Sequence, residues 1–310
     1  MLKQIQGLHH VTSIASDPQR NSDFFTKTLG LRRVKKTVNF DRPDVYHLYY
    51  GNGSGAPGSV MTYFPFPGRQ NGSPGTGEVS AVAFTVPPGS LGYWEQRLID
   101  HGVRQPKKYS IFNEKRLVFR APDGDFFVLT EMEDDPREPW TSGYVPSPAA
   151  IRGFHSVGLR VAKSRPTVSL LKLMGYQRTA KEGSIQRFVL KNGNQANILD
   201  LETLPHVPAA TQGAGSVHHV AFSVKDQAAQ QEARAALIEA GYDVTQTRDR
   251  DYFKAIYFRC PGGILFEIAT EDPGFDADEA LDQLGSALKL PKQHEHLRPQ
   301  LERSLQPIVD

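Results

Sequence analysis

Cysteine is nearly absent from this 310-residue chain, in which Cys260 is the only one. A single thiol excludes an internal disulfide and any metal site built from several cysteines, so a metal would have to be held by histidine and carboxylate. The chain also lacks an apolar run that could cross a bilayer or serve as a secretory signal, which predicts a cytoplasmic protein with no membrane partner. A formal net charge of only +2 leaves no field that would attract nucleic acid.

Two histidine pairs are the most informative feature that the chain does have. They open similar strand-like segments, Leu8-His9-His10-Val11 and Val217-His218-His219-Val220. Further on, Glu267 lies inside an apolar stretch over residues 264–268. A carboxylate in such a strand rarely stays buried without a partner. Two imidazoles and one carboxylate form the facial ligand set that holds non-haem Fe(II) with open coordination positions.

A unit of one strand, one helix ending in glycine and further strands repeats four times. We expect Leu91, Trp94 and Leu98 to share the buried face of the second helix. The repetition predicts an α+β fold of four βαβββ modules over residues 1–66, 76–140, 150–206 and 214–275. The first two modules would form an N-terminal half, residues 1–145, and the last two a C-terminal half, residues 146–275. Spaced leucines, from Leu281 to Leu305, predict two helices in a tail over residues 276–310.

This organisation resembles the vicinal-oxygen-chelate superfamily, which includes glyoxalases, fosfomycin-resistance proteins and extradiol ring-cleaving dioxygenases. The segments Val45–Tyr50, Pro57–Thr62 and Asp251–Phe253 look like those of the Fe(II) dioxygenases that open hydroquinone rings. The resemblance covers nearly the whole chain. It implies that modules pair into cup-shaped, curved mixed sheets, with a metal ion on the concave face.

Comparing the four modules shows which of them could hold a metal. The residues at the two equivalent ligand positions are His10, Ala81, Ser156 and His219 in the opening strands, and Tyr63, Val128, Asp200 and Glu267 in the last strands. Only the first and fourth modules supply ligands, and ligands must converge within about 2–2.3 Å of one ion. We therefore predict that modules 1 and 4 share the metal cup, whereas modules 2 and 3 form an empty, structural cup.

Strand geometry decides which histidine of each pair is the ligand. Neighbouring strand residues face opposite sides, so only one imidazole of each pair should point into the cup. His10 shares a face with Thr12, whereas Val11 between them faces the apolar side. We therefore predict that the metal ligands are His10, His219 and Glu267.

The resemblance adds residues around the metal. It implies that Tyr257 touches a substrate oxygen, that Arg250 lies near the pocket, and that Thr12, His9 and His218 surround the ligands. Two alternatives stay open, since Tyr257 could be an ordinary strand aromatic and Arg250 could form a surface salt bridge. His47 and His155 each lack a matched partner and are interpreted as structural.

Three functions compete at this stage. The resemblance favours an Fe(II)-dependent ring-cleaving dioxygenase that acts with O2 on a small hydroquinone-type aromatic, with Mn(II) or another divalent metal as an alternative ion. A glyoxalase-like lyase or thiol transferase of the same fold commonly uses a second glutamate, but Tyr63 stands there and is a poor ligand. A non-catalytic drug-binding resistance protein would need no metal ligands. A homo-oligomer is left open.

Overall fold

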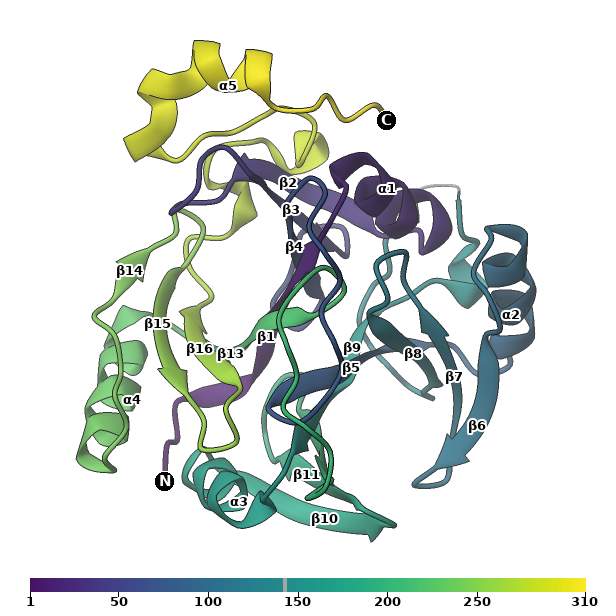
Figure 1. Cartoon of the computed structure of the whole chain (residues 1–310), viewed down its shortest axis with the longest axis vertical. Helices are drawn as coiled ribbons and strands as arrows, with labels where there is room; N and C mark the ends of the chain where they lie inside the picture. Colours follow the sequence, from purple (N-terminus) through teal and green to yellow (C-terminus); the bar gives the residue numbers. More distant parts are fainter. Residues whose placement is uncertain (142–143) are drawn as a thin grey trace.

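Two curved, mixed eight-stranded sheets carry the fold (Figure 1). The computed structural model describes residues 1–141 and 144–310. The strands of the first sheet are β1 (Ile5–Ala15), β2 (Arg32–Val38), β3 (Tyr46–Gly51), β4 (Val60–Pro65), β13 (Val217–Val224), β14 (Arg248–Asp249), β15 (Lys254–Arg259) and β16 (Leu265–Thr270). Those of the second sheet are β5 (Glu78–Val86), β6 (Lys107–Ile111), β7 (Glu114–Arg120), β8 (Phe126–Glu131), β9 (Gly153–Val161), β10 (Tyr176–Glu182), β11 (Ile185–Leu190) and β12 (Ile198–Thr203).

The strand order confirms the predicted pairing of modules. The first sheet runs β14-β15-β16-β13-β1-β4-β3-β2, so it joins the fourth module to the first, and the second sheet runs β10-β11-β12-β9-β5-β8-β7-β6. Antiparallel pairing of β1 with β13 joins the two ends of the chain at the centre of the first sheet. Each sheet therefore draws one module from each half of the chain, and the division into halves near residue 145 stays a prediction.

Short helices follow the opening strand of each module. They are α1 (Pro18–Asp23), continued by a π-helical turn over Phe24–Thr28, α2 (Leu91–Asp100), α3 (Ser164–Leu173) and α4 (Gln227–Glu239). As predicted, Leu91, Trp94 and Leu98 are the buried residues of α2. No helix in the described ranges is long and apolar enough to span a membrane.

The C-terminal tail lies over the β2 edge of the first sheet and is less helical than expected (Figure 1). Its α-helix is α5 (Arg298–Ser304), and 3-10 turns lie at Phe275–Ala277, Leu281–Gln283 and Lys292–Leu297. Elsewhere in the chain, a 3-10 turn at Ser147–Ala149 precedes β9. The first expected tail helix is therefore wrong, because Gly285 adopts a positive φ of 73° there. Fully buried Lys35 on β2 fastens this segment, with Nζ donating at 2.6 Å to both Asp278 and Glu279.

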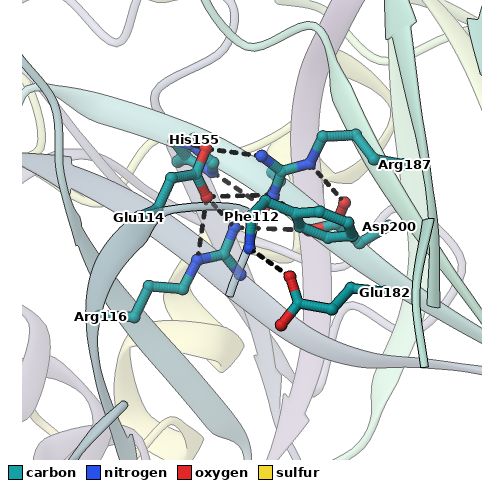
Figure 2. A network of polar contacts seen from close by, with 8 residues as sticks. Phe112, Glu114, Arg116, His155, Glu182, Arg187 and Asp200 are labelled. Carbon is teal, nitrogen blue, oxygen red and sulfur yellow. Dashed lines mark hydrogen bonds and ion pairs between the residues drawn. The ribbon is translucent and has the colours of Figure 1, made fainter. Parts of the chain in front are cut away.

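Ion pairs occupy the concave side of the second sheet (Figure 2). Arg187 on β11 donates from Nε and Nη2 to the two carboxylate oxygens of Asp200, at 2.8 and 2.9 Å, and from Nη1 to Glu114 at 2.5 Å. Arg116 donates to Glu114 at 2.6 Å and reaches Asp200 at 3.4 Å, while His155 lies 3.2 Å from Glu114. Two guanidinium groups thus balance the charge of two carboxylates. Asp200 is the residue of the second sheet that is equivalent to Glu267, and it is bound by arginine side chains.

Candidate metal centre

Three side chains predicted as metal ligands come together on the concave face of the first sheet. His10 lies on β1, His219 on β13 and Glu267 on β16, three adjacent strands. Nε2 of His219 lies 2.9 Å from Oε2 of Glu267, and Nε2 of His10 lies 3.5 Å from the same oxygen. The two Nε2 atoms are 3.4 Å apart. These are the only three ligand-type residues in the described ranges whose donor atoms cluster in this way.

The Glu267 carboxylate is buried in a manner that a metal ion would explain. The side chain has no exposed surface, and beyond the two nearby imidazoles neither carboxylate oxygen has a hydrogen-bond partner among the described residues. Burial lowers the pKa of His219, which favours the neutral imidazole that metals bind. Burial opposes ionisation of Glu267, but the adjacent imidazoles outweigh it and hold the pKa of the carboxyl well below its usual range. Two imidazole nitrogens beside a buried anionic carboxylate fit a divalent cation.

The neighbouring histidines contact the two predicted histidine ligands. Nδ1 of His9 lies 2.9 Å from Nδ1 of His10, and Nδ1 of His218 lies 2.8 Å from Nδ1 of His219. Burial lowers the pKa of His9 to about 3 and that of His218 to about 4, so both rings are neutral and their Nδ1 atoms can accept a hydrogen bond. A ligand imidazole that donates from Nδ1 keeps the lone pair of Nε2 turned toward the site.

Two β-bulges make this arrangement possible. They were not predicted, because side chains were expected to alternate strictly along each strand. Leu8 pairs with Phe222 and His10 with Ala221, so His9 is an extra residue in β1. On β13, His218 is the extra residue in the same way, because the pairing passes from His219 directly to Val217. A bulge re-aims side chains locally. It lets both imidazoles of each pair lie together rather than on opposite faces.

A cavity of about 560 Å³ opens beside the three side chains. Besides the triad, it is lined by predicted residues Tyr257, Arg250 and His218. Burial and the charge of Glu267 raise the pKa of Tyr257 well above its usual range, so its phenol stays protonated. Arg250 lies over the Tyr257 ring at 5.8 Å and bonds Asp41 at 3.2 Å. Arg250 therefore combines a salt bridge with a place on the cavity wall.

The structure corrects the position assigned to Tyr63. Glu267 pairs with Ala221, the residue two after His219, and in the first module Thr62 pairs with Thr12, the residue two after His10. The equivalent of Glu267 is thus Thr62, one residue earlier than expected. Tyr63 faces the other side, where its hydroxyl donates to Asp125 at 3.1 Å. Threonine, like tyrosine, replaces the second glutamate expected of a glyoxalase.

Other cavity residues were missed or interpreted as structural. His47 and Tyr49 on β3 both line the cavity, although His47 was expected to be structural. Phe40, Phe64 and Phe253 add apolar rings, and the Phe253 ring lies 5.0 Å from that of His10. The signal that could have identified His47 and Tyr49 is their alternate spacing on a strand that also faces the cup.

Comparisons with known proteins agree with this geometry. The family model described as "Glyoxalase/Bleomycin resistance protein/Dioxygenase superfamily" matches residues 7–124 and 147–268. The chain belongs to this superfamily. Among relatives, the chlorohydroquinone/hydroquinone 1,2-dioxygenase of Sphingobium indicum is 38% identical and is matched over 99% of this chain and 98% of its own length. MhqO of Bacillus subtilis, provisionally named a ring-cleaving dioxygenase, is 42% identical, with 99% of this chain and 98% of that protein covered.

Solved structures of the superfamily show the same architecture. A crystal structure of a provisionally named dioxygenase from Bacillus subtilis superposes with a TM-score of 0.95 at 41% identity, covering 99% of this chain and 98% of that one. Glyoxalase I from Zea mays gives a TM-score of 0.65 at 16% identity, covering 86% and 92%, and so shares the fold alone. Within the superfamily, the full-length similarity is thus to proteins named as dioxygenases.

Proposed function

We propose that this chain is an Fe(II)-dependent dioxygenase that opens a hydroquinone-type ring with O2. The observation that carries the proposal is the buried triad of His10, His219 and Glu267, whose carboxylate oxygens have no other partner. Two imidazoles and one carboxylate with open positions suit ferrous iron. The para-dihydroxylated substrate is favoured by full-length similarity to a protein named for hydroquinone and chlorohydroquinone.

In this proposal the three side chains hold the ion, and its bound form supplies the reaction with O2 that protein groups cannot perform. His9 and His218 keep Nε2 of the ligand imidazoles directed at the ion through their Nδ1 contacts. The carboxylate of Glu267 supplies one negative charge. With this single anionic ligand, a divalent ion held here would keep a net positive charge and would favour an ionised substrate oxygen.

The chain's own residues would bind and orient the ring. Phe64 and Phe253 supply apolar parts of the cavity wall, where the Phe64 ring lies 5.7 Å from His218 and that of Phe253 5.0 Å from His10. Such walls hold an aromatic ring and exclude water. Tyr257, kept protonated, donates a hydrogen bond to the substrate oxygen, and Arg250 stabilises negative charge on it.

The two other functions are less well supported. A lyase of this fold would commonly use a second glutamate as a fourth ligand, but Thr62 lies at that position and bonds Thr12 at 2.8 Å. A binding protein that only sequesters a drug has no need of three converging ligands. The binding protein also leaves the buried carboxylate of Glu267 unexplained.

The proposal is tested by oxygen uptake after anaerobic reconstitution with Fe(II). We expect O2 consumption with methylhydroquinone and chlorohydroquinone, and much slower consumption with catechol. Tyr257→Phe should keep its iron but lose about 10²-fold in turnover, as expected when a positioned proton donor is removed. Absence of O2 uptake with every hydroquinone, or a clear preference for catechol, would contradict the proposal. Unchanged kinetics of Tyr257→Phe would assign that ring to packing.

A further inference from the structure

A continuous line of hydrogen bonds crosses the wall of the cavity opposite β15. The Tyr49 hydroxyl lies 2.8 Å from Nδ1 of His47, and Nε2 of His47 lies 2.9 Å from Oγ1 of Thr62. Oγ1 of Thr62 lies 2.8 Å from that of Thr12, two residues beyond a metal ligand on the same strand. Tyr49, Thr62 and Thr12 have no exposed surface, and His47 has almost none. Four polar side chains are thus buried beside the site as one connected group.

Strand register shows that Tyr49 is the counterpart of Tyr257. In the fourth module Tyr257 pairs with Glu267, and in the first module Tyr49 pairs with Thr62, the residue equivalent to Glu267. The second cup has no tyrosine at this position. There, Val118 pairs with Val128, and Arg187 with Asp200. Tyrosine therefore stands at both equivalent positions of the metal cup and at neither position of the other.

Both tyrosines face the same cavity. They line it together, and both belong to the apolar cluster around Phe253 on the concave face. Burial, and then the charge of Glu267, raise the pKa of Tyr49 well above its usual range, so the phenol is protonated. A ring in the cavity would thus have one tyrosine toward the fourth-module wall and the other toward the first-module wall.

The hydrogen-bonding capacity of this group suits an oxygen that can act as donor or acceptor. A phenol can donate one hydrogen bond through its proton and accept two through its lone pairs. The contact with Nδ1 of His47 uses either the proton or one lone pair, depending on the tautomer of His47. If Nδ1 of His47 carries the proton, the Tyr49 proton is free to donate into the cavity. If Nε2 carries the proton, Tyr49 donates to His47 and can accept a hydrogen bond from a group bound in the cavity. Thr62 can act as acceptor or donor toward Nε2, so it accommodates both tautomers.

We propose that Tyr49, oriented by His47, binds the second oxygen of a para-dihydroxylated substrate. The inference rests on the proposed function, because it takes the first oxygen to lie at the ion beside Tyr257. The two hydroxyls of a hydroquinone are on opposite sides of the ring, as the two tyrosines are on opposite walls. The two hydroxyls of a catechol are neighbours, so its second oxygen stays near the ion. Tyr49 is then the residue that selects para over ortho substitution, and His47 is its positioning residue.

The test compares two ligands that differ only in the second hydroxyl. Dissociation constants of hydroquinone and phenol are measured by calorimetry on the Fe(II)-loaded protein without O2, so that no turnover is needed. In the parent we expect hydroquinone to bind about tenfold more tightly than phenol, the size of one buried hydrogen bond. In Tyr49→Phe this ratio should fall to about twofold or less. In Tyr257→Phe it should stay near the parent value, because the oxygen that Tyr257 contacts is present in both ligands.

Tyr50→Phe is the matched control. It is the next residue of β3, equally buried, but it faces the opposite side, where its hydroxyl donates to Asn21 at 3.0 Å. Its ratio should equal that of the parent. His47→Gln should reduce the ratio through lost orientation of Tyr49, and it carries the same test if Tyr49→Phe does not fold.

The outcomes separate this inference from the proposed function. An unchanged ratio in Tyr49→Phe, or equal affinities for hydroquinone and phenol in the parent, overturns the role of Tyr49. Oxygen uptake with hydroquinone that persists alongside either result leaves the proposed function standing. A parent that binds hydroquinone through Tyr49 yet consumes no O2 would instead contradict the proposed function.

Discussion

Glu267→Ala is expected to load only a small fraction of the iron held by the parent and to lose at least about 10²-fold in turnover. The substitution removes the one anionic donor of the triad and leaves two neutral imidazoles, which bind Fe(II) more weakly. It also removes a fully buried carboxylate that lies beside the two imidazoles and has no hydrogen-bond partner beyond them in the part of the chain that the structure describes. Metal content after desalting and oxygen uptake measure the two effects. Full iron content with retained activity would contradict the assignment of Glu267.

Thermal unfolding with and without metal adds a difference that a general packing defect would not give. Without metal, Glu267→Ala should be no more stable than the parent, because the adjacent imidazoles hold the pKa of the Glu267 carboxyl low and its ionised form then stabilises the folded state. With Fe(II), the parent alone should gain stability, since a ligand that binds only the folded state stabilises it. Asp200→Asn changes the equivalent position of the second cup and serves as the control. It should keep the parent's iron content per folded chain.

Arg187→Met is expected to destabilise the protein by about 3–5 kcal/mol while leaving iron content unchanged. Its guanidinium donates to both oxygens of Asp200 and to both oxygens of Glu114, and its side chain is only 8% exposed. Methionine would fill much of the volume but leave Asp200 with the weaker 3.4 Å contact to Arg116. The free energy of unfolding from a urea titration measures the loss.

Lys108→Met is the control for Arg187→Met within the same sheet. Lys108 bonds Glu95 at 2.7 Å, but both side chains are well exposed, at 47% and 38%. An exposed ion pair contributes about 0–1 kcal/mol, so this variant should lose little stability. A similar small loss in Arg187→Met, or loss of iron from a folded Arg187→Met protein, would contradict the division into a metal cup and a structural cup.

The pairing of modules could be predicted because it follows from residue types alone. Only the first and fourth modules supply histidine and glutamate at equivalent positions, and a metal requires its ligands in one place. The order of strands in the two sheets agrees with that reasoning. Ligand chemistry therefore predicted a long-range contact that the order of modules along the chain does not suggest.

The local distortions of the strands could not be predicted in the same way. His9 and His218 are bulge residues, and a bulge depends on the pairing partner across the sheet rather than on the residues of one strand. The assignment of Tyr63 failed for a related reason. The last strand of each module pairs at its own offset, and an error of one residue turns a strand residue to the other face. The register of β1 with β4 was needed to identify Thr62.

His47 illustrates a third limit of reasoning from the sequence. It was judged to be structural because no second module carries a matching histidine. Its partners instead come from its own module, Tyr49 two residues away on β3 and Thr62 on the neighbouring strand. A search for repeated ligand types finds what two modules share. It overlooks a polar group that belongs to one module only.

The most direct measurement is a crystal structure of the Fe(II)-loaded protein, with the iron located by its anomalous scattering. The account predicts one ion per chain, bound at about 2.0–2.3 Å by Nε2 of His10, Nε2 of His219 and the Glu267 carboxylate. It also predicts that no ion lies beside Asp200. Iron bound in the second cup, or an ion held without both the first and the fourth module, would contradict it.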